Sequence, residues 1–134
     1  MSLTILQPPG WAKPRGYANG VAATGRLVFV AGQIGWNANA EFESDDLVAQ
    51  AAQALRNVMA VLNEAGALPA HIVRMTWYVT DRAEYLRRAA ELGGAYREVI
   101  GRHFPAMSAV EVSALIEDRA KVEIEVTAVI PEAP

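Results

Sequence analysis

The chain has no cysteine among its 134 residues. Disulfide frameworks, thiolate metal sites and cysteine nucleophiles are therefore excluded. Histidine is also scarce: only His71 and His103 occur, and neither has a second histidine at metal-binding spacing. A phosphate-binding loop and a dinucleotide-binding glycine motif are absent as well. We therefore expect no metal site and no cofactor.

Long apolar runs are missing too. No stretch approaches the about 18 apolar residues of a membrane span, and the amino-terminal segment lacks the basic start and apolar run of a signal peptide. The formal net charge is −3 and the arginines are scattered, whereas nucleic-acid binding depends on clustered cations. The nearest cluster, Arg82, Arg87 and Arg88, is interpreted as a solvated helix face. We expect a cytoplasmic protein with no nucleic-acid or membrane partner.

What the chain does have is a globular composition, with 52% hydrophobic and 20% charged residues. Its length is typical of one domain, so we expect residues 1–134 to form a single domain. The proline- and glycine-rich segment Pro8–Gly20 predicts a loop. Leu27–Ala31 is apolar throughout and predicts a strand buried on both faces. Gly32 follows it and would let the backbone approach another group closely.

Apolar residues at three- and four-residue spacing predict two helices. The first is expected over Ser44–Ala65, with Ser44 or Asp45 capping the orphan N–H groups of its first turn. The second is expected to begin at Asp81, which has capping-box spacing to a following glutamate. The pair Gly93–Gly94 weakens the interior of this helix by up to about 1 kcal/mol per glycine, which suggests that a close neighbour needs the room.

Three further strands are expected at Ile72–Thr80, Met107–Val112 and Lys121–Ile130. The elements together indicate an α+β fold in which two helices cover one face of a sheet. The opposite face still carries apolar side chains, such as one side of Leu27–Ala31. We expect self-association to cover that face.

Two carboxylates, Glu123 and Glu125, stand two residues apart on the last strand and therefore face the same way. If that face were buried at a subunit interface, one of them would gain a raised pKa and serve as a general acid/base. The alternative is the solvent-exposed polar face of an amphipathic strand. Periodicity leaves both interpretations open.

Five short strings follow one known family pattern, in order, over nearly the whole chain. Arg15–Val21 (RGYANGV) is similar to the pattern G-P-Y-S-x-A/G-V, and Val30–Ile34 (VAGQI) resembles the turn S-G-Q-I/L. Gln53–Gly66 resembles the family's helix pattern, which closes L-x-x-A-G. Pro105–Ser108 (PAMS) stands where the family has P-A-R-S, and Val122–Glu125 (VEIE) matches its closing strand. The chain thus resembles the RidA/YjgF family of enamine/imine deaminases, also named endoribonuclease L-PSP-like.

The resemblance implies a chorismate-mutase-like α+β protomer, with a mixed β-sheet and two helices packed on one face. It also implies a homotrimer with small-molecule clefts between adjacent subunits. In active members an arginine holds the substrate carboxylate, and a glutamate on the last strand positions the attacking water. Carried over, the glutamate is Glu123, the catalytic residue. The implied substrate-binding residues are Tyr17, Ala31, Gly32, Gly93, Met107 and Ala109.

The chain departs from this pattern at three positions. Met107 replaces the motif arginine, Ala31 replaces a serine, and Gly93 stands where the family often has asparagine. Burying a carboxylate without a cationic partner is heavily penalised. We therefore expect a more apolar pocket, less suited to imino acids. Met107 has the alternative role of an ordinary strand residue filling a core gap. The residues that would replace the lost charge are Arg15, Arg102 or Lys13.

Three functions follow from the resemblance. The first is a hydrolase that attacks a small reactive imine with water aligned by Glu123, with altered substrate preference. The second is a non-catalytic trimer that binds a small hydrophobic or carbonyl compound in the same clefts. The third is a ribonuclease, which the acidic charge and the lack of a clustered basic or histidine site disfavour.

Overall fold

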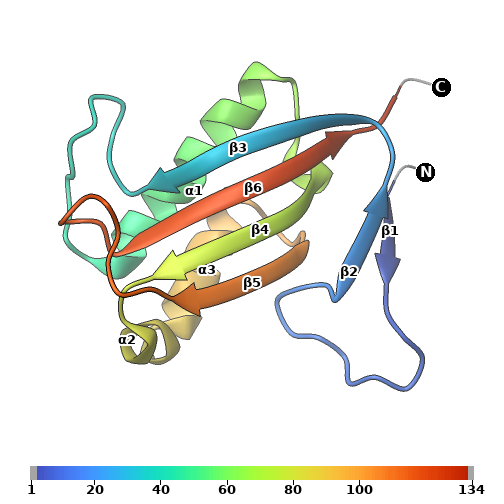
Figure 1. Ribbon diagram of the computed structural model, residues 1–134, viewed down its shortest axis with the longest axis horizontal. Helices are drawn as coiled ribbons and strands as arrows, with labels where there is room; N and C mark the ends of the chain where they lie inside the picture. The colour runs from blue at the N-terminus through green and yellow to red at the C-terminus, as the bar shows by residue number, and fades with distance from the viewer. Residues whose placement is uncertain (1–2, 133–134) are drawn as a thin grey trace.

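The computed structural model describes residues 3–132. Its main element is a four-stranded sheet with the strand order β3-β6-β4-β5 (Figure 1). β6 is antiparallel to β3 and to β4, while β4 and β5 are parallel, so the sheet is mixed. The strands span Arg26–Ile34 (β3), Ile72–Val79 (β4), Ala106–Glu111 (β5) and Val122–Ile130 (β6).

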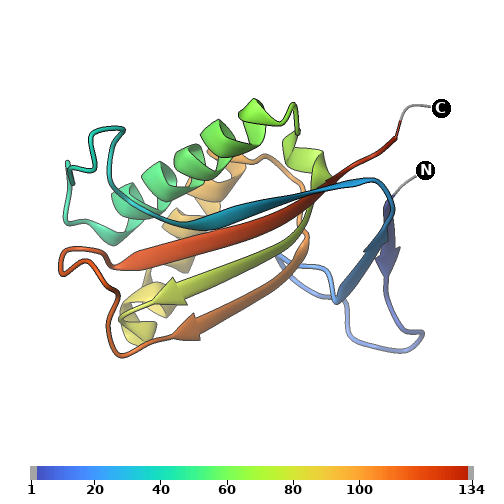
Figure 2. The same ribbon diagram turned by 45° about the horizontal axis from the view of Figure 1, so that its top comes forward.

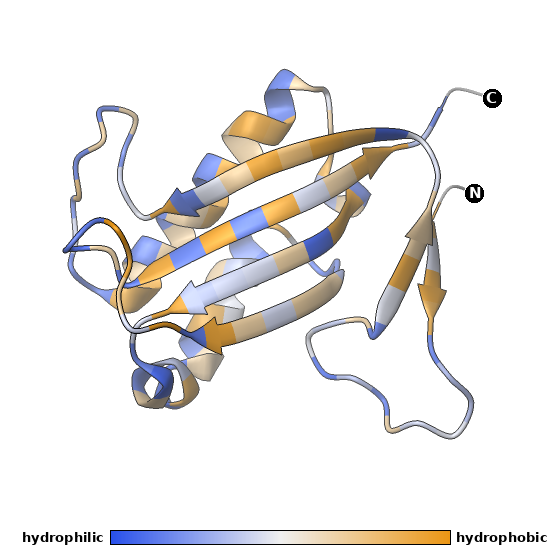
Figure 3. Cartoon of the chain, viewed as in Figure 1, coloured by the Kyte–Doolittle hydropathy of each residue, from blue (hydrophilic) through white to orange (hydrophobic). Residues whose placement is uncertain are grey.

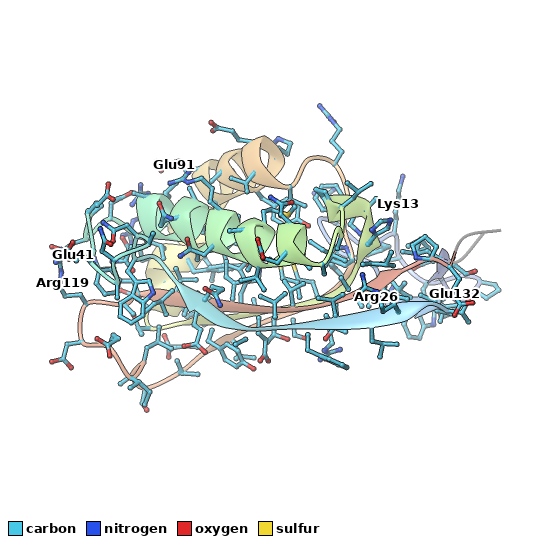
Figure 4. The ribbon with its side chains drawn as sticks, turned by 90° about the horizontal axis from the view of Figure 1, so that it is seen from above. Lys13, Arg26, Glu41, Glu91, Arg119 and Glu132 are labelled. Carbon is cyan, nitrogen blue, oxygen red and sulfur yellow. The ribbon has the colours of Figure 1, made fainter. Side chains whose placement is uncertain are left out.

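Helices pack on one face of this sheet, as the turned view in Figure 2 shows. They are α1 (Leu47–Glu64), α2 (Arg82–Arg87) and α3 (Ala89–Val99), and the short 3-10 helix η1 (Pro69–His71) precedes β4. Seen from above in Figure 4, the opposite face carries side chains but no helix within residues 3–132. The predicted α+β fold, with a mixed sheet and helices on one face, is confirmed.

The core lies between the helices and the sheet. Figure 3 shows hydrophobic and hydrophilic residues alternating along β6, because the pleat sends successive side chains to opposite faces. Each large apolar side chain buried there contributes about 1.5–3 kcal/mol. The fully buried ones include Leu55, Val58, Leu62, Ile72, Met75, Val122 and Ile124.

Helix α1 begins later than predicted. Its N-cap is Asp46, whose carboxylate accepts a hydrogen bond from the Ala49 N–H at 3.0 Å. The two predicted caps have other partners: the Ser44 hydroxyl accepts from the Asp46 N–H at 3.0 Å, and Asp45 pairs with Arg119 at 2.9 Å. The prediction that Ser44 or Asp45 caps the helix was therefore wrong. Ser44, Asp45 and Asp46 all carry side-chain oxygens that can cap a first turn, so the sequence does not distinguish them.

The second predicted helix is divided into α2 and α3 at Arg88. Asp81 caps α2 as predicted, accepting from the Glu84 N–H at 3.0 Å. The backbone of Arg88 leaves the helical region, with φ −98° and ψ 16°. Its guanidinium pairs with Asp46 at 2.9 Å and with Glu91 at 2.8 Å. The contact with Asp46 reaches the start of α1, and a local pattern cannot show such a tertiary partner.

The glycine pair in α3 has open space around it. A Cβ added to Gly94 would meet nothing within 4 Å, and one added to Gly93 would lie 3.3 Å from Nη1 of Arg97 alone. The expectation that a close neighbour needs this room is therefore wrong within the described chain.

Strand β3 is buried on one face only. Val30 is 4% exposed, whereas Leu27 and Phe29 are 57% and 72% exposed. The prediction of burial on both faces is wrong for the isolated chain, because no element covers the second face within residues 3–132. The strand also runs past Ala31 to Ile34.

A hairpin of β1 (Leu3–Leu6) and β2 (Gly20–Ala23) stands apart from the main sheet (Figure 1). The sequence analysis did not predict it, because both strands are only four residues long and neither shows a clear alternation. The predicted loop Pro8–Gly20 connects them, except that Gly20 already belongs to β2.

None of the helices in residues 3–132 has the length and apolar character to cross a membrane. The same residues contain no group of three or more His, Asp or Glu side chains placed to hold a metal ion.

Candidate functional site

Glu123 and Glu125 lie on the face of the sheet opposite the helices, which we call the open face. Their Cα partners on β4 are Tyr78 and Thr76, whose side chains share that face. Glu123 is partly buried and Glu125 is exposed. The prediction that both carboxylates share one face is confirmed.

Gly32 brings the backbone of β3 against the Glu123 carboxylate. A Cβ added to Gly32 would overlap Oε2 of Glu123 and lie 2.7 Å from its Cδ, so only glycine fits without displacing that carboxylate. A bulge between Val30 and Gln33 shifts the register here, as bulges often do beside functional sites. The predicted close approach at Gly32 is confirmed, and the group it approaches is Glu123.

The two glutamates differ in their hydrogen bonds. The Tyr78 hydroxyl donates to Oε1 of Glu125 at 2.5 Å, and this bond to a carboxylate raises the pKa of Tyr78. The Glu123 carboxylate has no side-chain hydrogen bond within residues 3–132. Glu123 is therefore the carboxylate that is available to a water or a ligand.

Ala31 also belongs to the open face. It lines a shallow hollow of about 450 Å³ beside Glu125, together with Phe29, Arg74 and Thr76. Ala31, Gly32 and Glu123 therefore form one group on this face.

Met107 and Gly93 lie elsewhere, in a cavity of about 390 Å³ on the helix side of the sheet. We call it the aromatic cavity, because four aromatic residues line it: Trp77 from β4, Tyr85, Tyr96 and Phe104. Its other lining residues are Arg15, Gly16, Ala89, Leu92 and Arg97.

The aromatic rings hold one another in place. Tyr96 stacks on Phe104 with a centroid distance of 5.6 Å and an interplanar angle of 12°. Trp77 meets Tyr85 edge to face at 6.3 Å. The Tyr96 hydroxyl donates to the His103 carbonyl oxygen at 2.6 Å, and burial raises the pKa of Tyr96. The indole Nε1 of Trp77 is buried without a partner in the described chain, which is uncommon.

Two arginines line the cavity beside Met107. Arg15 comes from the loop before β2, and Arg97 comes from α3. Neither forms a salt bridge within residues 3–132. Of the three cations proposed from sequence, only Arg15 lies here, because Lys13 and Arg102 line a separate hollow. The sequence analysis missed Arg97, although its i,i+4 spacing from Gly93 was the available signal.

Tyr17 and Ala109 join neither group. Tyr17 is 42% exposed and lines the hollow of about 670 Å³ that also contains Trp11, Lys13 and Arg102. Ala109 lines a small hollow beside α2 with Tyr85.

One chain therefore does not bring the predicted site residues together. Met107 pairs with Met75, which pairs with Val126, and these three side chains belong to the helix side. Glu123 is three residues before Val126 on β6 and so faces the other way. Within the described chain, the sheet itself separates Met107 from Glu123.

Comparisons with known proteins cover most of the chain. A family model described as endoribonuclease L-PSP matches residues 11–130. A RutC family protein of Haemophilus influenzae is 40% identical over 105 residues, which is 78% of this chain and 80% of the relative. A 2-iminobutanoate/2-iminopropanoate deaminase of Salmonella typhimurium is 36% identical over 132 residues, which is 96% of this chain and 98% of the relative.

A solved structure gives the same result for the fold. A Yersinia pestis protein of unknown function of the conserved Rid protein family superimposes with a TM-score of 0.83 at 35% identity. The match covers 97% of this chain and 100% of that one.

Proposed function

Since the chain belongs to the RidA/YjgF family, as its motifs predicted, we propose that it is an enamine/imine deaminase-type hydrolase acting on a small reactive imine. The observation that carries this proposal is the Glu123 carboxylate, which has no hydrogen-bond partner within residues 3–132 and lies against the Gly32 backbone. A carboxylate without a hydrogen-bond partner is able to accept a proton from a water within hydrogen-bond reach.

The proposed reaction uses one water and releases ammonia. Glu123 accepts a proton from the water while the oxygen attacks the imine carbon, and returns that proton to the nitrogen, which gives a carbinolamine. Glu123 then takes the proton of the carbinolamine hydroxyl and passes it to the nitrogen. The carbon–nitrogen bond breaks, a carbonyl forms, and ammonia leaves. The net change is imine plus water to carbonyl compound plus ammonia.

A complete site would need a second copy of the chain. Ala31, Gly32 and Glu123 lie on the open face, while Gly93 and Met107 lie on the helix side. We propose that the open face of one protomer docks beside the aromatic cavity of the next in a homotrimer. The exposed Phe29 supports this, because large apolar side chains on a sheet face favour association.

The second candidate function is a non-catalytic binder of a small hydrophobic or carbonyl compound. Met107 at the position of the motif arginine supports it, because a methionine cannot hold a substrate carboxylate. The two candidates differ in whether Glu123 is needed for turnover.

The test is an assay with enzymatically generated 2-aminoacrylate, run beside an active family member. We expect Glu123→Gln to keep its fold and assembly while losing imine hydrolysis, since the amide cannot accept the proton. Glu125→Gln is the matched control, because it lies on the same strand face and is already bound to Tyr78. Turnover that is unchanged in Glu123→Gln would exclude Glu123 as the base, and an inactive wild type would favour the binder.

A further inference from the structure

The aromatic cavity combines an apolar wall with two arginines. The proposed role of Glu123 as the base involves neither the wall nor the arginines. We propose that this cavity binds a small carboxylic acid bearing a single aromatic ring, with the ring against Trp77, Tyr85 and Phe104 and the carboxylate on Arg97 and Arg15. The claim that such an acid is a substrate rests on the proposed function. The claim that the cavity binds it does not depend on that function.

The size of the cavity suits one ring with a polar extension. Its volume is about 390 Å³, whereas an apolar cavity of about 150 Å³ is enough for benzene. Ligand sites usually span about 300–1,000 Å³, so the cavity lies near the small end of that range.

The wall favours a ring over a flexible polar chain. Trp77, Leu92 and Tyr96 are buried, with exposures of 4–5%. The ring contacts already described limit the movement of Trp77 and Tyr96. Met107 completes this surface with a polarisable thioether, which packs well against aromatic rings. A second aromatic ring from a ligand would meet offset or edge-to-face partners here.

The charge at the cavity is positive and uncompensated. Both Arg15 and Arg97 are exposed, and no acidic residue is among the described residues that line the cavity. Nη1 of Arg97 lies 3.3 Å from the position that a Cβ on Gly93 would take, so the guanidinium occupies space left by the missing side chain. Arginine binds carboxylates through two parallel hydrogen bonds.

Arg97 would therefore supply the cation that Met107 lacks, but from a helix instead of from β5. Moving the charge from the strand to α3 leaves the strand position apolar. The cavity beneath it is then free for a ring. The expected substrate is a 2-imino acid with an aromatic side chain, not the smaller acids named for the Salmonella relative.

The experiment measures binding by calorimetry with 3-phenylpropanoate as the probe. Propanoate lacks the ring and 3-phenylpropanamide lacks the charge, so both should bind at least tenfold more weakly. Arg97→Met should weaken 3-phenylpropanoate binding by about ten- to a hundredfold, the usual effect of losing a charge-assisted hydrogen bond. Arg87→Met is the matched control, because Arg87 is exposed on neighbouring α2 and does not line the cavity.

A second variant tests the ring independently of the charge. Ala89→Leu adds volume to the cavity wall and should weaken 3-phenylpropanoate at least tenfold while leaving propanoate binding unchanged. Loss of binding in Arg97→Met and Ala89→Leu, but not in Arg87→Met, is the expected result. The inference is overturned if the wild type does not bind 3-phenylpropanoate, or if Arg97→Met binds it as tightly as the wild type.

Kinetics separate this inference from the proposed function. The substrates are 2-aminoacrylate-derived imine and the imine formed by enzymatic oxidation of phenylalanine. Hydrolysis of both through Glu123, with a raised KM for both imines in Arg97→Met and for the aromatic imine alone in Ala89→Leu, supports both proposals. Hydrolysis that Arg97→Met leaves unchanged overturns the cavity assignment and leaves the hydrolase. Arg97-dependent binding without any hydrolysis overturns the hydrolase and leaves the cavity.

Discussion

The two faces of the sheet differ in what their side chains do, and β6 shows this within one strand. Val122, Ile124 and Val126 are buried at 0–3% exposure under the helices. Glu123 and Glu125 alternate with them and are the ionisable residues of the strand. Along β6, the side chains on the helix side therefore build the core, and those on the open face are left for reaction and assembly.

The largest expected effect comes from truncating the helix side of β6. Ile124→Ala should destabilise the protein by about 2–5 kcal/mol, because Ile124 is 0% exposed and the cavity would not collapse fully. Glu125→Ala, one residue away on the open face, should change the free energy of unfolding by less than about 0.5 kcal/mol. Urea unfolding of both variants checks this. Equal destabilisation by the two variants would mean that both faces of β6 contribute equally to the free energy of unfolding.

Assembly is the next effect in size, and it tests the open face. Light scattering coupled to size exclusion should report about three times the 14.4 kDa chain mass for the wild type. Phe29→Asp should shift the population toward monomer, since each interface would lose about 1.5–3 kcal/mol of apolar burial. Ile116→Asp is the control, because that side chain is 95% exposed outside the sheet. A wild type that stays monomeric at micromolar concentration would contradict the trimer.

The smallest effect is expected for two glycines in different surroundings, Gly94 and Gly32. Gly94→Ala should stabilise the protein by up to about 1 kcal/mol, because nothing lies within 4 Å of the new Cβ. Gly32→Ala should not stabilise the protein, because the new Cβ would displace the Glu123 carboxylate. Thermal melts should therefore show a higher Tm for Gly94→Ala and no gain for Gly32→Ala. A gain in both would mean that Glu123 moves aside without cost.

Much of the sheet was predictable because its signals are local. The alternation along β6 and the apolar run in β3 need no knowledge of the rest of the chain. The position of Gly32 beside Glu123 was also accessible, through the family pattern and through the ability of glycine to admit another group. The start of α1 was not, because Ser44, Asp45 and Asp46 are chemically similar caps and tertiary partners decide between them.

Arg97 at the aromatic cavity was missed for a similar reason. The sequence analysis looked for a replacement in the loop Pro8–Gly20 or a few residues before Met107. Arg97 reaches the cavity only because α3 packs across β4 and β5, and Gly93 leaves it room. The separation of Met107 from Glu123 follows from strand register, which the motif pattern does not contain.

Arg88 has a consequence for the behaviour of the protein in acid. Its guanidinium binds Asp46, the cap of α1, and Glu91 in the first turn of α3. The hydrogen bond from Arg88 holds the pKa of each carboxyl below its usual value. A lowered pKa in the folded state means that this stabilisation is present at neutral pH and is lost as the pH falls through the folded-state pKa. Protonation of these carboxyls would break the Arg88 contacts at the start of α1 and at the start of α3. Two helices that are separate in sequence would therefore lose stabilisation over the same range of acidic pH.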